Sequence, residues 1–556
     1  MALVAAAAIA PLVAFSQTPS STLYNQLAAL FGWGVVLLFV SEDVRRLRID
    51  AAAIALLLLL AAPLASTAVN GLPLSLALQP AALIAAALAV YLCAAGLPDG
   101  LRERVFDWFC WGLLLAGLLS LAVSVIQVFA PGLADGKLIA HSGLPGRAIG
   151  NMRQPNHLAS LMMWACVAAT WLCDRGSLCR AGRFLLPLLL AGFVFAIVLS
   201  ASRTGMWAGV PALMAWGLID GRLQRSTRIT LGATALMFVL SWWAMDGWAA
   251  SGHVFGAQVR LEAEGAGSHS RVAILANALE LVRRNPWTGV GWGEFNLAWS
   301  MTPFPERPIA FFDHTHNILM QFAVELGLPA TLLIVTLILW ALWRALGATI
   351  RADGSEAVMR SSALMMVLVI GLHSMTEYPL WYAYFLLPAA FAMGVGARTT
   401  HAPEHAIARP ILSLAGVLLL AGSVFAIWDY QRVVIIYAPA ATDAPLAERV
   451  RAGQHSIFFS AFADYAAATS MSGGPEALAA AKRTAHNLID ARLMMEWAEH
   501  LHEAGDDDRA RYVAQRLKEF RNPEAKAWLA KCDTDDAQKP FQCTPPKREY
   551  TWREMR

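Results

Sequence analysis

Residues 51–69 read AAAIALLLLLAAPLASTAV, a run without a charged side chain. A helix of about 20 apolar residues crosses the hydrocarbon core of a bilayer, which is about 30 Å thick. This run is therefore predicted to be a transmembrane helix. Comparable runs recur along the 556 residues, of which 57% are hydrophobic and 15% charged, whereas a soluble domain carries about 25% charged residues. We expect a protein that crosses the membrane many times.

The apolar runs set the fold class and the number of helices. They lie at 2–16, 24–41, 51–69, 78–97, 107–129, 156–173, 184–200, 204–219, 229–247, 328–346, 358–376, 380–397 and 410–428. The first run is short and has no preceding Lys or Arg, so it lacks the positive region of a signal peptide and is interpreted as a membrane helix. We expect an all-α fold with about 13 membrane helices, or about 12 if the first run lies only in the interface.

The arginines between the runs predict the orientation of the helices, because short loops rich in Lys and Arg stay in the cytoplasm. Arginines follow every second run, whereas the loops at 17–23 and 66–78 contain no Lys or Arg. The N-terminus is thus predicted inside, and the loops at 130–155, 200–204 and 248–315 outside. The arginines concerned are Arg45, Arg46, Arg48, Arg102, Arg104, Arg175, Arg180, Arg183, Arg222, Arg225, Arg228, Arg344, Arg351, Arg398 and Arg409.

The end of the chain changes character. It shows short amphipathic helical patterns, with Gly505-Asp506 as a turn between two of them. The patterns lie at 477–489, 492–504, 507–520 and 523–531. They suggest a small TPR-like domain, predicted outside and used for protein contact, although the repeat is too weak to count.

The predicted domains follow from these changes in composition. We divide the chain into membrane helices at 1–247, a large outer loop at 248–315, further membrane helices at 316–428 and the helical domain at 429–556.

The seven cysteines form two groups. Cys532 and Cys543 lie in a polar stretch and can form a disulfide if that stretch is in an oxidising compartment. The others lie in or beside apolar runs and are interpreted as small buried hydrophobic residues; they are Cys93, Cys110, Cys166, Cys173 and Cys179.

Nucleic-acid binding is excluded by the charge pattern. The net charge is only +3, and no basic stripe with interleaved aromatic residues appears.

Ionisable residues close to the membrane are the first candidates for function. Arg203 lies in the shortest predicted outer loop, Ser200-Ala201-Ser202-Arg203-Thr204-Gly205. The donors of a guanidinium match phosphate oxygens in pairs, so Arg203 is suited to hold a lipid phosphate at headgroup level. The alternative is an arginine at a helix end that extends its charge to water.

A second arginine, Arg271, opens an amphipathic helix at 272–283. The helix is followed by Gly289-Val290-Gly291-Trp292-Gly293, where the glycines suit a tight turn that approaches a ligand or another segment. The spacing is not that of a dinucleotide site. A plain surface arginine is the alternative for Arg271.

The run Asp313-His314-Thr315-His316-Asn317 precedes an apolar helix that begins at Ile318. An imidazole with a pKa near about 6.5 is a suitable general base for a hydroxyl. Two histidines at i, i+2 do not share a helix face, which argues against a helical zinc pair. A structural histidine is the alternative.

Two further groups lie in predicted outer loops. The segment Gly146–His157 holds Arg147, Arg153, Gln154, Asn156 and His157, whose side chains suit sugar hydroxyls or phosphate, or else cap the next helix. Glu377 lies in Thr376-Glu377-Tyr378-Pro379 and pairs either with an arginine of the site or with solvent.

The order of these motifs resembles the O-antigen ligase and polymerase superfamily of the Wzy-C type. Within it, Gln154-Pro155-Asn156-His157, the run His314-Thr315-His316-Asn317, Glu377-Tyr378-Pro379 and the helical tail are most similar to PglL-type bacterial O-oligosaccharyltransferases. The resemblance is strongest over 145–320. It implies a GT-C-like membrane fold in the bacterial inner membrane, with the outer loops and the tail in the periplasm.

The resemblance also implies an activity. A preassembled glycan would pass from undecaprenyl diphosphate to a serine or threonine hydroxyl of a periplasmic protein such as a pilin. His316 would be the base, and Arg203 and Arg271 would stabilise the leaving diphosphate without a metal. Attack opposite the leaving group implies inversion at the anomeric carbon. Substrate contacts would come from Arg147, Arg153, Gln154, Asn156, His157, His314, Asn317 and Glu377.

Other functions remain open from the sequence. The sequence does not decide firmly between His314 and His316 as the base. His316 is preferred because it directly precedes Asn317 and the helix. The acceptor can instead be lipid A core, as for a ligase, or another glycan, as for a polymerase. A transporter of lipid-linked glycan is a third class, but few charged residues lie in mid-helix and no inverted repeat is evident. No cofactor is expected.

Overall fold

A computed structural model describes the chain from Met1 to Arg556, except residues 45–46, 176–181, 265–268, 398–407, 472 and 534–538. Its regular structure within the described ranges is helical, with an isolated bridge between Gln17 and Ser20. Four of the arginines used for orientation, Arg45, Arg46, Arg180 and Arg398, lie outside the described residues, as does Cys179.

The helices of the membrane part and the outer loops are α1 Ala2–Leu12, α2 Leu23–Val40, α3 Ala51–Asn70, α4 Leu74–Ala95, α5 Asp99–Phe129, α6 Pro155–Asp174, α7 Gly182–Ser200, α8 Val210–Ile219, α9 Arg225–Gly232, α10 Thr234–Ala250, α11 Gly256–Glu264, α12 His269–Arg284, α13 Phe295–Met301, α14 Ile318–Arg351, α15 Gly354–Ser374, α16 Ala383–Gly396 and α17 Ala408–Tyr437. The helices of the tail are α18 Leu446–Gln454, α19 Ser460–Ser470, α20 Pro475–Thr484, α21 Ala491–Glu503, α22 Asp507–Phe520 and α23 Lys526–Ala530. Short turns of helix flank several of these, among them the π-helix η3 Gly205–Gly209 before α8.

Each predicted apolar run falls on a helix, so the all-α polytopic fold is confirmed. Among the described residues, nine helices are long and apolar enough to cross a membrane, and four shorter apolar helices account for the remaining runs. One of the short helices, α1, has 11 residues. At 1.5 Å per residue it is too short to span about 30 Å of hydrocarbon. This favours the smaller of the two predicted helix counts.

The chain divides into two compact units, and each is described by itself. Unit 1 comprises Met1–Leu57, Leu83–Gly267 and Thr336–Val424. Unit 2 comprises Leu58–Ala82, Ser268–Val335 and Phe425–Arg556. Most of the segment 248–315, which is predicted to be a large outer loop, therefore belongs to the same unit as the tail. The composition of the sequence does not reveal this grouping.

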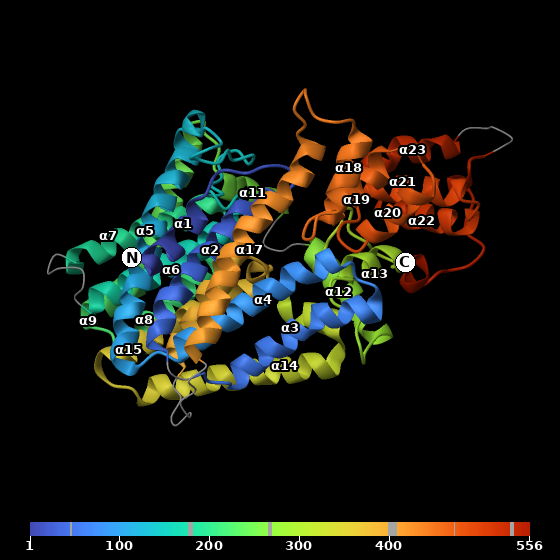
Figure 1. Cartoon of the computed structure of the whole chain (residues 1–556). Helices are drawn as coiled ribbons and strands as arrows, with labels where there is room; N and C mark the ends of the chain where they lie inside the picture. Colours follow the sequence, from blue (N-terminus) through green and yellow to red (C-terminus); the bar gives the residue numbers. More distant parts are fainter. Residues whose placement is uncertain (45–46, 176–181, 265–268, 398–407, 472, 534–538) are drawn as a thin grey trace. The chain divides into compact units, whose positions relative to one another are not determined.

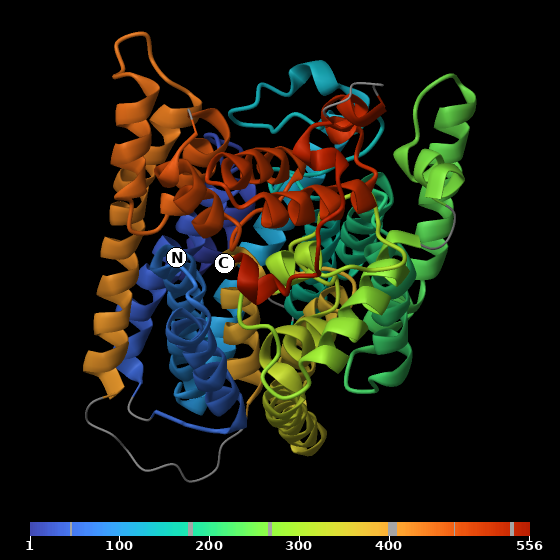
Figure 2. The same ribbon diagram turned by 90° about the vertical axis from the view of Figure 1, so that its right-hand side faces the viewer.

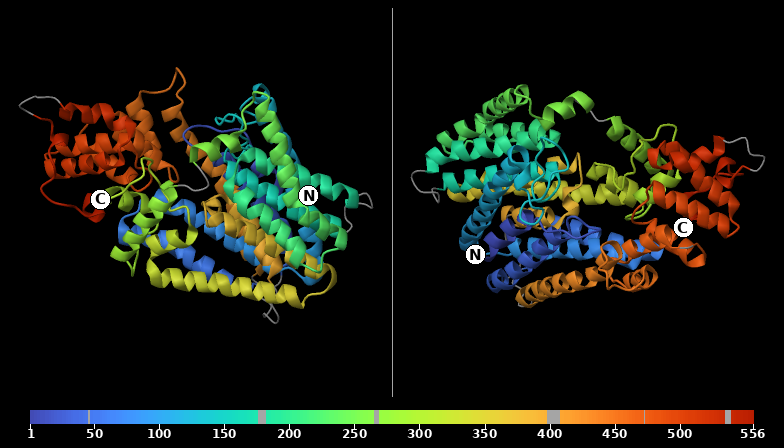
Figure 3. Two further views of the ribbon diagram at one scale, coloured as in Figure 1. Left: turned by 180° about the vertical axis from the view of Figure 1, so that it is seen from behind. Right: turned by 90° about the horizontal axis from the view of Figure 1, so that it is seen from above.

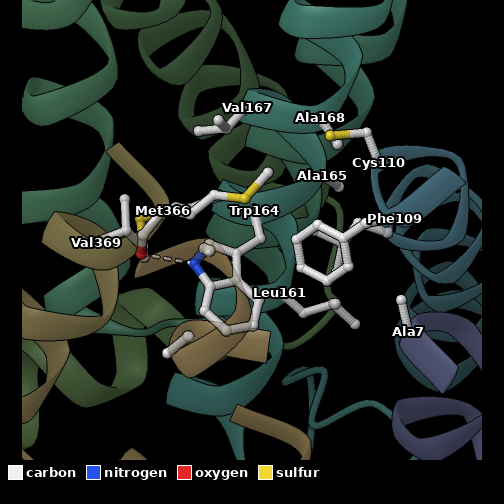
Figure 4. Packing of buried hydrophobic residues seen from close by; sticks show 14 of the residues in the cluster. Ala7, Phe109, Cys110, Leu161, Trp164, Ala165, Val167, Ala168, Met366 and Val369 are labelled. Carbon is white, nitrogen blue, oxygen red and sulfur yellow. Dashed lines mark hydrogen bonds between the residues drawn. The ribbon is translucent and has the colours of Figure 1, made fainter. Parts of the chain in front are cut away.

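The core of unit 1 is built around α6, which packs against α5, α7 and α15. Figure 3 shows the helices of this unit side by side from two directions. Nearly all residues of α6 are buried. Figure 4 shows the centre of this packing, where the indole Nε1 of Trp164 donates to the carbonyl of Met366 at 2.9 Å. Ala165 and Ala168 let the helices approach closely, as small residues do between membrane helices. This core fixes the N-terminal end of α6, where several candidate residues lie.

The tail in unit 2, drawn in orange to red in Figure 2, consists of short helices packed in pairs, with α19 against α20 and α21 against α22. The predicted turn at Gly505 is present, with φ of +81°. The predicted helix at 477–489 ends earlier, at Thr484, because the backbone turns there and the N–H of Asn487 donates to the carbonyl of Thr484 at 2.9 Å. The helical nature of the tail is thus confirmed, and its TPR-like character stays a prediction.

The cysteines behave as predicted where they are described. Cys532 and Cys543 form a disulfide with a Cα–Cα distance of 5.2 Å. The free cysteines that the structure describes are buried; they are Cys93, Cys110, Cys166 and Cys173.

The glycine-rich segment 289–293 approaches another segment of unit 2, as its composition predicts. The N–H groups of Val290 and Gly291 donate to the carbonyls of Val324 and Glu325 at 2.7 and 2.9 Å. Gly289 has φ of +65°, and a Cβ there would lie 2.4 Å from the carbonyl carbon of Glu325. The close approach holds the first part of α14, which begins directly after the histidine run.

We expect Gly289→Ala to destabilise unit 2. An alanine in the left-handed region costs about 1–3 kcal/mol, and the Cβ also forces the two backbones apart. The melting temperature in detergent should fall. Gly371→Ala is the matched control, because Gly371 lies inside α15 with nothing within 4 Å of its would-be Cβ. An equal effect of the two substitutions would contradict the close-approach argument.

Candidate functional site

The predicted site residues are distributed over both units. Unit 1 holds Arg147, Arg153, Gln154, Asn156, His157, Arg203 and Glu377. Unit 2 holds Arg271, His314, His316 and Asn317. The meeting of Arg203, Arg271 and His316 at one headgroup stays a prediction.

The segment before α6 is fixed by its own side chains. Gln154 caps α6, because its side-chain oxygen accepts from the N–H groups of Asn156 and His157. Arg153 adopts φ of +56° and donates to the carbonyls of Ser21 and Ala14. These two predicted contact residues therefore have structural partners within unit 1.

Asn156 connects two distant segments of unit 1. Its Nδ2 donates to Glu377 at 3.2 Å, and its Oδ1 accepts from the hydroxyl of Ser202 at 2.6 Å. Glu377 is only 7% exposed. A buried carboxylate is unfavourable unless it is hydrogen-bonded, so Asn156 stabilises Glu377 and at the same time fixes the loop that carries Arg203.

Arg203 lies at a break between two helices. The chain turns at Ala201, with φ of +52°, and Ser202 then accepts from the N–H of Gly205 at 3.1 Å, the contact of a helix N-cap. Arg203 is half-buried at the first position of the new helix. Its backbone is thus held on both sides, which suits a residue that must present a guanidinium in one place.

Two other arginines fix the same turn. Arg147 donates from Nε to the carbonyl of Ser200 at 2.8 Å, and Arg260 donates to the carbonyl of Ala201 at 3.1 Å. The end of α7 exposes carbonyl oxygens that have no partner within the helix. Arg147 therefore satisfies a helix end as well as lying in the predicted contact group.

His157 lies in an aromatic and polar group that the sequence interpretation missed in part. It is 2% exposed, and its Nδ1 is 2.9 Å from the hydroxyl of Tyr384. His373 lies nearby, with ring centroids 5.7 Å apart, and bonds to Ser160 at 2.7 Å. His373 is an ionisable residue inside the apolar run 358–376, and that signal was present in the sequence.

The histidine run in unit 2 is shaped by local hydrogen bonds. Asn317 caps α14 by accepting from the N–H of Met320 at 3.0 Å. The N–H of Thr315 donates to the side chain of Gln321 at 2.8 Å, and its hydroxyl donates to the carbonyl of Asn317 at 2.8 Å. His316 has φ of +55°. Left-handed backbone at a residue other than glycine is strained and frequent at functional sites.

Asp313, His314 and His316 form a hydrogen-bonded series. Asp313 bonds to Nδ1 of His314, and Nε2 of His314 lies 3.1 Å from Nδ1 of His316. Desolvation would raise the pKa of Asp313, but the hydrogen bond from His314 opposes this, and the net effect lowers the pKa to below the ordinary aspartate value. Asp313 is therefore ionised at neutral pH and accepts from His314.

Arg271 lies in the first turn of α12 and is half-buried. The helix is held by its apolar face, including Ile274, Ala278 and Leu281, which are at most 1% exposed. Asn277 adds a hydrogen bond to the carbonyl of Glu306 at 3.2 Å. Arg271 therefore lies on a helix that is packed within unit 2.

Side chains of the types that bind metal ions occur in both units. They are the imidazoles of His314 and His316 in unit 2 and the carboxylate of Glu377 in unit 1. The expectation that no metal takes part stays a prediction.

Three family models match successive parts of the chain. The model described as "Protein glycosylation ligase" matches residues 148–173, which include the Gln154–His157 segment. The model "O-Antigen ligase" matches 188–335, which include Arg203, Arg271 and His316. The model "Virulence factor membrane-bound polymerase, C-terminal" matches 361–531, which include Glu377 and most of the tail.

Two curated proteins of Acinetobacter baylyi are similar to the chain. A "General O-oligosaccharyltransferase" is 27% identical over 346 residues, 58% of this chain and 56% of the relative. A "ComP-specific O-oligosaccharyltransferase" is 22% identical over 306 residues, 52% of this chain and 51% of the relative. The chain thus spans about half the length of the curated relatives it matches.

Among solved structures, an archaeal oligosaccharyltransferase, AglB from Archaeoglobus fulgidus, aligns at 13% identity with a TM-score of 0.23, covering 87% of this chain and 59% of that one. At that TM-score the likeness carries no argument, and the GT-C-like arrangement stays a prediction. The family models and the sequence relatives, by contrast, support the resemblance that the sequence motifs predict. The predicted resemblance to the O-antigen ligase superfamily is therefore confirmed, and within it the chain is similar to PglL-type O-oligosaccharyltransferases.

Proposed function

We propose that the protein is a glycosyltransferase that moves a preassembled oligosaccharide from undecaprenyl diphosphate to a serine or threonine hydroxyl of a periplasmic protein such as a pilin. The similarity to named O-oligosaccharyltransferases supports the reaction class. The observation that carries the mechanism is the hydrogen-bonded series from Asp313 through His314 to His316.

The proton positions in this series favour His316 as the base. Ionised Asp313 accepts the Nδ1–H of His314, so the Nε2 of a neutral His314 is an acceptor. It then accepts the Nδ1–H of His316, which leaves the lone pair of a neutral His316 on Nε2. The tautomers are inferred from the hydrogen bonds. His314 acts in this scheme as the group that orients the base.

The proposed reaction is a single displacement. The acceptor hydroxyl gives its proton to Nε2 of His316, and its oxygen forms a bond to the anomeric carbon. The bond between that carbon and the diphosphate oxygen breaks, so the diphosphate leaves with an additional negative charge. Arg203 and Arg271 stabilise that charge through fixed guanidinium donors. Attack from the side opposite the leaving group inverts the anomeric carbon.

The remaining candidates are proposed to contact the donor at the edge of this centre. Their hydrogen bonds within the protein define how far each can take part: Arg147, Arg153, Gln154 and Asn156 already hold backbone or side-chain partners. They are therefore proposed to order the binding surface, with their remaining N–H groups donating hydrogen bonds to the sugar or phosphate of the substrate.

We propose that the centre and the tail lie in the periplasm of a bacterium, with the helices in the inner membrane. The pattern of arginines supports this orientation. The disulfide between Cys532 and Cys543 also supports it, since disulfides form in the periplasm and are rare in the cytoplasm.

The proposal is tested by supplying the purified full-length protein with lipid-linked glycan and purified pilin, and measuring the mass of the pilin. A mass increase equal to the glycan is expected. A parallel sample contains lipid A core in place of pilin. Transfer to the core alone would identify a ligase, and elongation of the lipid-linked glycan alone would identify a polymerase. The absence of any transfer would contradict the enzyme assignment.

Transfer is expected to continue after treatment with EDTA, because two guanidinium groups can neutralise the diphosphate without a cation. The measurement is the rate of pilin modification before and after chelation and dialysis. Loss of activity that added Mn²⁺ or Mg²⁺ restores would contradict this mechanism. It would direct attention to the imidazoles of the histidine run as metal ligands.

A further inference from the structure

The segment from Thr302 to Phe312 connects α13 to the histidine run and has no regular secondary structure. Segments of this kind are usually mobile. Here the segment lies in unit 2 together with the tail, and α13 packs against α22 (Figure 1). The contacts between this segment and the tail therefore determine how firmly the histidine run is held.

Arg307 anchors the middle of the segment. It is 4% exposed and donates to the carbonyl of Trp299 at 2.7 Å and to that of Thr302. Its guanidinium carbon lies 4.5 Å from the ring centre of Phe520 on α22. Its Nη2 forms an ion pair with Oε2 of Glu519 at 3.6 Å. A buried arginine is unfavourable unless it is paired and hydrogen-bonded. Burial lowers the pKa of Arg307 to about 10, so the group remains cationic at neutral pH.

Phe520 contacts the segment at two places. Its ring stacks on Phe311 with centroids 3.9 Å apart and meets Trp299 edge-on at 5.4 Å. Phe520 is fully buried. Tyr512 lies on the same helix, about two turns before Phe520, and donates its hydroxyl to the carbonyl of Met301 at 2.7 Å. The same tail helix thus holds both ends of the segment.

The contacts continue to the proposed base. Phe312 follows the stacked Phe311, and its ring meets the imidazole of His316 edge-on with centroids 5.4 Å apart. The carbonyl of Phe312 accepts from Asn296 at 2.8 Å. A shift of the Phe311–Phe520 stack would therefore move the ring that packs against His316.

We propose that Phe520 and Arg307 are positioning residues for His316, so that the tail holds the base in the geometry that transfer requires. This rests on the proposed function, because the base is assigned there. It extends the expected use of the tail, which is protein contact, to a direct effect on the catalytic step.

The test compares Phe520→Ala with Phe541→Ala in the full-length protein. Phe541 is a matched control, since it is also buried in the tail but contacts His502 and Trp528 instead of the segment. Misplacement of a reacting group by about 1 Å costs up to roughly 100-fold in rate. We therefore expect kcat to fall roughly 10- to 100-fold for Phe520→Ala, with KM for the acceptor little changed. Phe541→Ala should keep the wild-type kcat.

Two acceptors separate positioning from docking. If Phe520→Ala displaces His316, kcat falls both for a pilin and for a short serine-containing peptide. If the substitution instead damages a docking surface on the tail, KM rises for the pilin alone. Phe520→Leu, which keeps much of the apolar volume, guards against a folding defect and should give an intermediate kcat. An effect restricted to KM for the pilin would overturn the proposal.

A measurement without turnover keeps the two proposals distinguishable. Hydrogen exchange of the amides in 302–316 should be faster in Phe520→Ala than in the wild type, and unchanged in Phe541→Ala. If the wild type fails to transfer glycan while this exchange difference is present, the proposed function fails and the positioning of the segment stands. Equal exchange in all three proteins would overturn the positioning role.

Discussion

Replacing His316 by alanine is expected to lower glycan transfer by about 10²–10⁴-fold, the usual contribution of a general base. The side chain removed is the one whose Nε2 would take the proton of the acceptor hydroxyl. The hydrogen bonds of Thr315 and Asn317 that shape the run do not involve the imidazole. The variant should therefore insert and melt like the wild type, and the measurement is the rate of pilin modification at saturating donor.

His314→Ala and Asp313→Asn give the graded comparison. Both leave an imidazole at position 316 but remove its orientation and its defined tautomer, so both should lose less activity than His316→Ala. If His314→Ala is the more severe substitution and His316→Ala retains the wild-type rate, the two histidines must exchange roles. Donor binding, measured by photocrosslinking of a lipid-linked glycan, should survive all three substitutions.

The fold was largely predictable because its main determinant is local. An apolar run such as 51–69 reports directly on the thickness of the bilayer, and each predicted run became a helix. The cap at Asn317 and the turn at Gly505 also follow from neighbouring residues. The units were not predictable in this way, because the division depends on contacts between segments as distant as Tyr512 and Met301.

The candidate site was predictable as a set of residue types and not as a geometry. The sequence placed His314 and His316 in one run, but the direction of their hydrogen bonds depends on the left-handed backbone at His316. Arg307 carries no pattern in the sequence that marks it for burial among aromatic rings. Asn156 and Glu377 are hydrogen-bonded although they are 221 positions apart. A single sequence contains no signal that identifies two such distant residues as hydrogen-bond partners.

Arg203→Lys is expected to lower transfer roughly 10²-fold or more, the effect of removing one fixed donor from a developing negative charge. The substitution keeps the positive charge, so a loss measures geometry. A guanidinium can donate two parallel hydrogen bonds to a phosphate, whereas an ammonium is a point charge on a flexible stem. Arg344→Lys is the control, since Arg344 lies near the C-terminal end of α14, on the side predicted to be cytoplasmic.

The backbone around Arg203 makes this experiment interpretable. Ser202 and Asn156 fix the turn through their own side chains, and these contacts do not use the guanidinium. The lysine variant should therefore keep the wild-type melting temperature while kcat falls and KM for the lipid-linked donor rises. If kcat and KM both stayed at the wild-type values, Arg203 would be a helix-end arginine that extends to water, and the charge of the leaving diphosphate would have to be met elsewhere. A loss confined to KM would mean that Arg203 binds the diphosphate equally in the ground state and the transition state, because only a contact that strengthens during bond cleavage changes kcat.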